Sequence, residues 1–124
     1  MRMYRVGDDV GALEDWPFDN PDSRYRVLRG APRASGRLEA GGAGALTRAG
    51  IWRCTPGAFR CIEQGDELMT VLAGRCRITD HGRGDAVDLG PGDTLFIRDG
   101  SDVTWEVAET VTKVFFGAKA TPYR

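Results

Sequence analysis

Three residues with chemical potential lie close together in the chain, Cys61, Glu63 and Glu67. One thiolate and two carboxylates can hold a soft or borderline metal ion, and a carboxylate whose pKa is moved toward neutrality can act as a general base. Two neighbouring carboxylates repel each other, so burial would raise the pKa of at least one unless a cation is near. The candidate cation is Lys113, which lies in the otherwise apolar run 110–116.

Each of these residues also has a purely structural interpretation. Glu63 could face water in the turn 63–66, and Lys113 could extend its ammonium group to the rim. Cys61 could be a small buried apolar side chain, as unpaired cysteines often are, since no histidine lies nearby in the sequence to make a thiolate. The single histidine, His81, lies in the expected hairpin turn 80–84 and is predicted to be solvated.

Short apolar and β-branched runs must position the candidate residues. The runs 68–72, 76–79, 86–89 and 94–97 are separated by glycines and a proline, as is typical of strands of four or five residues joined by tight turns. Such strands are too short and too numerous for an open α/β sheet. The sequence therefore predicts an all-β fold, a small antiparallel barrel or sandwich with few bare edges.

Alternation within the runs predicts which side chains share a face. In the run 75–78, two arginines alternate with Cys76 and Ile78, so these two are expected to point inward. Alternation also puts Glu67 on the same face as Met69 and Val71. Both faces of that strand are apolar enough that parity alone does not decide which one is interior.

Composition divides the single expected domain into three parts. Residues 1–46 carry three prolines among charged residues and end in a glycine-rich connector, so they are predicted to be an extended arm with one edge strand near 25–28. Residues 47–118 are predicted to form the barrel, and residues 119–124 a short polar tail. The large apolar side chains of the arm need a burial site, on a neighbouring subunit or on their own barrel: Trp16, Phe18 and Tyr25.

Charge and cysteine content exclude several classes of protein. The 17 basic and 18 acidic residues are interspersed, without the basic stripe that binds nucleic acid or a segment that binds membranes. The N-terminus lacks the apolar run of a signal peptide, so a cytoplasmic location is expected. Three cysteines form neither a disulfide framework nor a zinc pattern, and reduced thiols are expected. The predicted partners are a small molecule and a second copy of the chain.

Two motifs carry a resemblance to a known family. Glu67, followed after six residues by Gly74, matches the end of the first cupin motif, and Gly92-Asp93-x-x-x-Ile97-x-x-Gly100 matches the start of the second. Together with the segments 50–57 and 104–107, these residues make the chain resemble the small cupins that include ureidoglycine aminohydrolase and ethanolamine-utilisation type domains. The resemblance implies a cupin barrel over about residues 30–118, a homodimer whose arms cross between subunits, and an inward-facing Glu67.

The metal site implied by the resemblance is altered in this sequence. Metal-binding cupins resemble His-x-His, then three or four residues, then Glu, with a further His in the second motif. Alignment on Glu67 and Gly74 puts Cys61 and Glu63 at the positions of the first two histidines and Val103 at that of the last. We therefore predict that the protein has no stoichiometric transition metal and no other cofactor.

Two functions remain open on these residues. The first is a metal-free barrel that encloses a small polar or aromatic metabolite beside Glu67, with contacts from Cys61, Met69, Val103 and Trp105. The second is an enzyme, such as an isomerase, lyase or cyclase, with Glu67 or Glu63 as general base and Lys113 as electrostatic partner. For Trp105, a pocket wall and plain core are both open.

Overall fold

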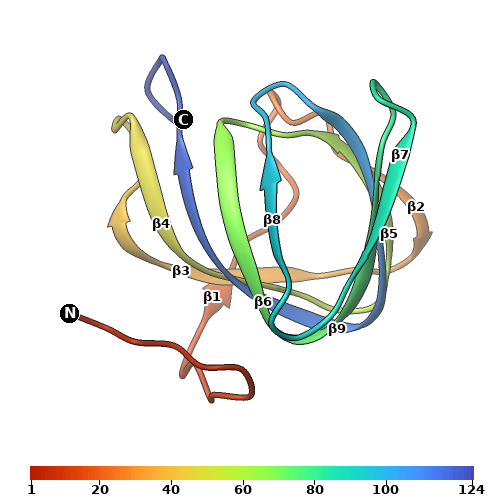
Figure 1. Ribbon diagram of the computed structural model, residues 1–124. Helices are drawn as coiled ribbons and strands as arrows, with labels where there is room; N and C mark the ends of the chain where they lie inside the picture. Colours follow the sequence, from red (N-terminus) through yellow and green to blue (C-terminus); the bar gives the residue numbers. More distant parts are fainter.

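Nine strands and no helix form the protein in the computed structural model, which describes all residues, 1–124 (Figure 1). The strands are β1 (Glu14–Asp15), β2 (Arg26–Gly30), β3 (Ala34–Gly41), β4 (Thr47–Cys54), β5 (Gly57–Ile62), β6 (Asp66–Asp80), β7 (Asp85–Leu89), β8 (Thr94–Ile97) and β9 (Asp102–Ala118). The all-β prediction is confirmed. The structure contains no helix with the length and apolar character needed to cross a membrane.

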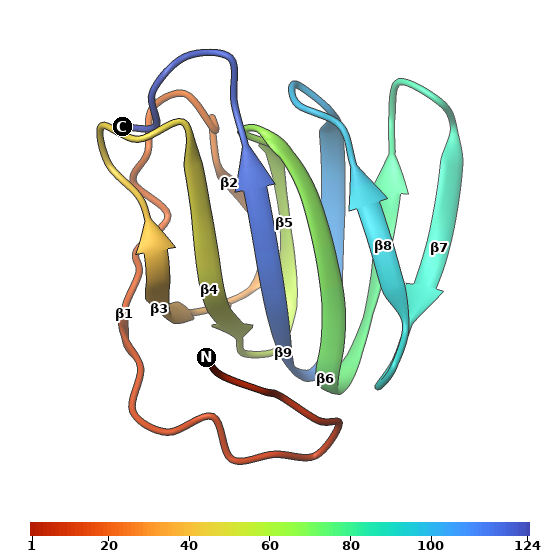
Figure 2. The ribbon, with the colours of Figure 1, turned by 60° about the vertical axis from the view of Figure 1, so that its left-hand side comes forward.

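The strands form one antiparallel sheet that curls into a half-barrel. Hydrogen bonds connect them in the order β1-β3-β4-β9-β5-β2, and β6 pairs with β9, β7 and β8. Strands β6 and β9 are the longest and pair with each other from 66 to 80 of β6, so that they run from one wall of the half-barrel to the other (Figure 1). Figure 2 shows β7 and β8 as two separate short strands beyond β6. The interior therefore lies on the concave side of β6 and β9.

Strand β6 differs from the prediction of two separate strands, 68–72 and 76–79. Gly74 has a φ of 82° and lies where the register between β6 and β9 shifts. A Cβ atom at this position would lie 2.0 Å from the carbonyl oxygen of Thr110, so only glycine fits here. Because a bulge lets a strand curve without ending, Gly74 bends the strand and does not terminate it.

A core of 14 buried residues fills the concave side of the sheet. It includes Cys76 and Ile78, which point inward as the alternation predicts, and it also includes Cys54 and Cys61. All three cysteines are free thiols. Burial raises the pKa of Cys54 to about 12 and that of Cys76 to about 11, so both remain protonated at neutral pH and act as small apolar side chains.

The aromatic residues of the arm pack on the barrel of their own chain. The Phe18 ring lies 4.7 Å from the Tyr25 ring and 4.6 Å from the Phe59 ring of β5, and Trp16 meets Phe115 of β9 edge-on at 6.4 Å. Of the two burial sites considered for these side chains, the structure shows the one within the same subunit. The homodimer stays a prediction.

The first 46 residues contain more regular structure than the expected edge strand. That strand is present as β2, but β3 also lies in this segment and pairs along its length with β4. The sequence of β3 is small and polar, so it lacks the apolar alternation by which strands are recognised. At Gly36 in β3, an added Cβ would lie 2.3 Å from the Trp16 ring, so the small residue makes room for the arm.

Candidate functional site

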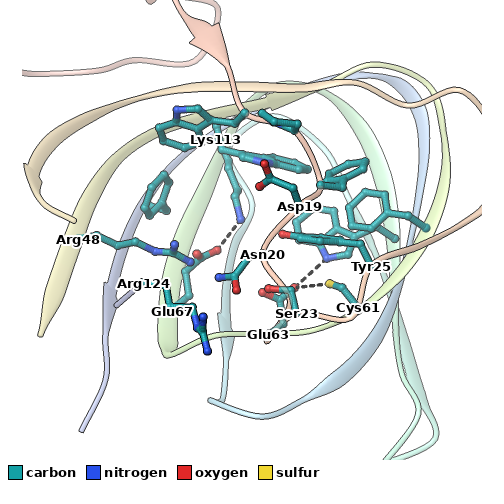
Figure 3. A pocket seen from close by; sticks show the side chains of 17 residues that line it. Asp19, Asn20, Ser23, Tyr25, Arg48, Cys61, Glu63, Glu67, Lys113 and Arg124 are labelled. Atoms are coloured by element: carbon teal, nitrogen blue, oxygen red, sulfur yellow. Dashed lines mark hydrogen bonds and ion pairs between the residues drawn. The ribbon is translucent and has the colours of Figure 1, made fainter. Parts of the chain in front are cut away.

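A cavity of about 330 Å³ lies between the concave face of the sheet and the arm (Figure 3). This volume is at the small end of the range for sites that bind small molecules. Much of its wall is aromatic, with rings from β4, β5, β9 and the arm: Trp52, Phe59, Trp105, Phe115, Phe18 and Tyr25. The remaining wall carries the charged candidates, so the cavity joins apolar surface to a few polar groups.

An ion pair between Lys113 and Glu67 lies in the cavity wall. Lys113 Nζ donates a hydrogen bond to Glu67 Oε2 at 2.5 Å, and the two side chains are only 7% and 6% exposed. The ammonium nitrogen also lies 4.8 Å from the ring centroid of Trp105 and 4.9 Å from that of Trp52. Cation–π attraction and the carboxylate together offset the cost of removing both charges from water.

The register of β6 and β9 brings this pair together. Lys113 of β9 is paired with Val71 of β6, and Glu67 precedes Val71 by four residues, so all three share the inward-facing parity. Glu67 and Val71 are buried. The interior orientation expected for Glu67 is therefore the one observed, and Lys113, the expected cation, forms the ion pair with it.

Glu63 follows the end of β5 and points into the same cavity (Figure 3). Its Oε1 accepts a hydrogen bond from Trp105 Nε1 at 2.9 Å, and Cys61 Sγ lies 3.8 Å from the same oxygen. Burial, and then the charge of Glu67, raise the pKa of Glu63, and Lys113 and Trp105 oppose this shift. Glu63 can thus keep a proton at a pH where an ordinary glutamate has lost it.

The interpretation that placed Glu63 in solvent is wrong, and backbone hydrogen bonds give the reason. The Glu63 N–H donates to the carbonyl of Ser101, and the Glu63 carbonyl accepts from the N–H of Gly100. These two bonds tie the turn after β5 to the loop before β9. With its backbone held in this way, Glu63 directs its side chain toward the concave face.

The donors around the cavity do not fit a transition metal. Burial, followed by the charge of Glu63, raises the pKa of the Cys61 thiol far above its usual range, which favours the protonated thiol. Glu67 is engaged by Lys113. The single imidazole, that of His81, is exposed and contacts Thr104 Oγ1 at 2.7 Å. No group of three or more His, Cys, Asp and Glu side chains is gathered as metal ligands.

The structure brings most of the candidate residues together but not all of them. The residues that line the cavity are Cys61, Glu63, Glu67, Trp105 and Lys113. Met69 and Val103 do not line it; each is 1% exposed and belongs to the apolar core. Both point inward as parity predicts, but their side chains are enclosed by core neighbours and do not line the cavity.

Several lining residues were not identified from the sequence. Phe59 could have been found, because it shares its strand face with Cys61. Arg48, at the start of β4, and Asn20, in the arm, carried no signal of their own. Their position depends on how the arm folds back across the barrel, which the local pattern does not encode.

More than half of the chain matches a known protein family. A family model described as the EutQ-like cupin domain matches residues 41–115. Among solved structures, a putative ethanolamine utilization protein Q from Salmonella typhimurium LT2 has 19% identity and a TM-score of 0.58, covering 74% of this chain and 72% of that chain. The EutQ protein of Clostridium difficile has 18% identity and a TM-score of 0.60, covering 77% of this chain and 81% of that chain.

A cupin-like protein from Thermotoga maritima MSB8 is similar over more of the chain. It has 15% identity and a TM-score of 0.66, covering 91% of this chain and 83% of that chain. At these identities, the likeness shows the fold alone. No curated protein sequence matches the chain. The predicted cupin fold is thus confirmed, while the chemistry must be argued from the cavity.

Proposed function

The chain belongs to the EutQ-like cupin family, and on that premise we propose that its half-barrel binds a small polar or aromatic metabolite without a histidine-held metal. One observation carries the proposal: the interior is hollow where its polar groups converge. A cavity of about 330 Å³ joins aromatic walls to the buried Lys113–Glu67 pair and to Glu63. Since one cupin shape serves many chemistries, this site and not the fold supports the function.

The aromatic walls would supply most of the contact area for a ligand. The rings of Trp52 and Trp105 lie 5.1 Å apart, and the Phe59 ring is stacked parallel to that of Trp105 at 6.1 Å. Such surfaces favour flat or apolar parts of a metabolite. The few polar groups among them would fix its orientation, as in most small-molecule sites.

The arm would enclose the ligand. The Ile62 N–H donates to the carbonyl of Ser23 at 2.7 Å, and Gln64 Nε2 donates to the carbonyl of Asp22 at 3.1 Å. Arg124, from the C-terminal tail, pairs with the carboxylate of Asp22 at 2.7 Å. These contacts hold residues 20–25 over the cavity and would exclude water from a bound metabolite.

An enzyme is the second candidate, and the difference between the two glutamates favours it. Glu67 is paired with a cation, whereas the pKa of Glu63 is raised by burial and by Glu67. Two carboxyl groups whose environments push them toward different protonation states can serve as acid and base in one reaction. In this function, an isomerase, lyase or cyclase, Glu63 exchanges the proton and Lys113 stabilises developing negative charge.

Native mass spectrometry of the purified, untagged protein tests the proposal. After exposure to a metabolite extract, we expect a one-to-one complex with a small molecule, and elemental analysis should find no stoichiometric transition metal. Trp52→Leu, in the cavity wall, should weaken the complex, whereas Leu46→Ala, an exposed site outside the cavity, should not.

The opposite results are equally informative. The absence of any complex, or an unchanged complex in the Trp52 variant, contradicts interior binding. One bound transition metal per chain contradicts the metal-free site. Conversion of the bound metabolite, detected by NMR and lost in Glu63→Gln, would favour the enzyme over the binding protein.

A further inference from the structure

The cations that line the cavity are not equally paired. Lys113 is bound to Glu67 and Arg124 to Asp22. Arg48 takes part in none of the ion pairs of the chain. Its single hydrogen bond is a long one, 3.5 Å from Nη2 to the carbonyl of Gln64, and its buried Nε has no partner. The guanidinium group of Arg48 therefore has N–H donors left to bind a further acceptor.

Aromatic rings hold Arg48 in position. Its Cζ lies 4.3 Å from the ring centroid of Tyr123 and 5.9 Å from that of Phe115. A guanidinium group is weakly hydrated and stacks well on rings, so little freedom is left for it to lose when a ligand binds. Figure 3 shows Arg48 reaching from β4 into the cavity below Lys113. A planar fork of N–H groups held in this way matches a carboxylate.

Two further donors face the same space. Asn20 Oδ1 accepts a hydrogen bond from the N–H of Asp22 at 3.0 Å, so the oxygen of this amide is occupied and its NH2 group is free to donate. Glu63, in its protonated form, can donate as well, since its Oε1 already accepts from Trp105. In Figure 3, Asn20 lies between Arg48 and Glu63. Three donor groups thus face the cavity, namely the guanidinium of Arg48, the NH2 group of Asn20 and the protonated carboxyl of Glu63.

The charges around the cavity lead to the same result. Lys113 and Glu67 cancel, and burial raises the pKa values of Glu63, Cys61 and Tyr25, which favours their neutral forms. At the rim, Arg124 is neutralised by Asp22, and the exposed carboxylate of Asp19 is screened by solvent. What remains inside is the positive charge of Arg48.

We propose that the ligand is a small organic monoanion whose carboxylate is bound by Arg48 and Asn20, with the rest of the molecule against Trp105 and Glu63. This inference rests on the proposed function, interior binding of a small molecule, and specifies its chemical class. It makes Arg48 the residue that selects for charge, while the aromatic walls select for shape.

Acid and amide pairs of matched shape test the charge of the ligand. The probes are propionate with propionamide, and benzoate with benzamide, followed by calorimetry and by the fluorescence of the cavity tryptophans at pH 6. We expect each acid to bind about ten- to hundredfold more tightly than its amide, as for hydrogen bonds to charged groups. Arg48→Gln should remove this preference, and Arg48→Lys should keep only part of it. Arg98→Gln, at an exposed site outside the cavity, is the matched control.

Two further variants keep the test decisive if Arg48→Gln folds poorly. Asn20→Ala should weaken binding of the acids but not of the amides. Deprotonation of Glu63 puts a negative charge next to the carboxylate of the bound acid. Affinity for the acids should therefore fall as pH rises through the raised pKa of Glu63, and Glu63→Gln should remove this dependence.

The outcomes separate this inference from the proposed function. Equal binding of acid and amide, or a preference that survives in Arg48→Gln, overturns the inference and leaves interior binding intact. Failure of every acid to bind while a metabolite from the extract does bind has the same meaning. Absence of binding in both experiments overturns the two together.

Discussion

The two ends of the half-barrel are built by the same strands yet have different interiors. At the packed end, where β7 lies against β6, aliphatic and thiol side chains fill the space, among them Cys76, Ile78 and Val107. At the cavity end, the same β6 and β9 direct Glu67 and Lys113 inward and leave a hollow. Both ends follow the same alternation.

The comparison teaches what each kind of interior requires. At the packed end, each buried side chain contributes independently through the apolar area that it removes from water. At the cavity end, each buried polar group is tolerated because it has a partner. Lys113 forms an ion pair with Glu67, and Trp105 donates a hydrogen bond to Glu63. Stability at the cavity end should therefore depend on pairs, and at the packed end on volume.

Breaking the ion pair should have the largest effect. Lys113→Met leaves the Glu67 carboxylate buried without its cation, and we expect the free energy of unfolding to fall by about 3–5 kcal/mol at pH 7. Urea unfolding measures this. The double variant Lys113→Met with Glu67→Leu, in which neither charge remains, should recover most of the loss. If Lys113→Met alone were as stable as the parent protein, the ion pair would not contribute to stability at the cavity end.

A deletion at the packed end should have the next largest effect. Ile78→Ala leaves a void in the apolar core, and we expect a loss of about 2–4 kcal/mol. Urea unfolding at pH 4 and pH 7 sharpens the comparison. The loss in Ile78→Ala should be the same at both, because the removed groups carry no charge. A pH-dependent loss in Ile78→Ala would contradict the distinction between the two ends.

The raised pKa of Glu63 should make the stability of the protein depend on pH. An ordinary glutamate has a pKa of 4.5, and the pKa of Glu63 in the folded chain is higher, so over the interval between the two values unfolding releases a proton. The contribution of Glu63 to the free energy of unfolding is therefore fully present below pH 4.5. It is lost as pH rises through the pKa of the folded state, by at most about 1.4 kcal/mol per pH unit. Thermal unfolding of Glu63→Gln from pH 4 to pH 8 should be flatter, and identical profiles would contradict the shift.

The hydrogen bond from Trp105 to Glu63 should have the smallest effect. Trp105→Phe keeps an aromatic ring in the wall and removes the N–H donor, so we expect a loss of about 1 kcal/mol. In Glu63→Gln, the amide oxygen can still accept this hydrogen bond, so that variant is the control. Urea unfolding of Trp105→Phe, of Glu63→Ala, which removes the acceptor, and of the double variant isolates the interaction, and additive losses would show that the bond contributes nothing.

The ionisable residues show how far the candidate site could be predicted. Parity put Glu67 on one face with Met69 and Val71, but only the resemblance, through the spacing to Gly74, made that face the interior one. For Lys113 the sequence left an interior position and the rim open, and the structure shows it buried beside Glu67. Glu63 lies beyond the end of β5, where no parity applies, and the hydrogen bonds to Gly100 and Ser101 decide its direction. Arg48, from β4, and Asn20, from the arm, line the same cavity only in the folded chain.

The sequence by itself determined that this chain is an all-β protein, that Cys76 and Ile78 face inward, and which side chains could carry charge inward. Only the tertiary structure decided that Gly74 bends β6 without ending it, that Trp16 packs on Phe115 of the same chain, and that Glu63 turns inward. The reason is physical. Alternation is a property of neighbouring residues, whereas bulges, the course of the arm and the ties between loops depend on hydrogen bonds and contacts between residues far apart in the chain.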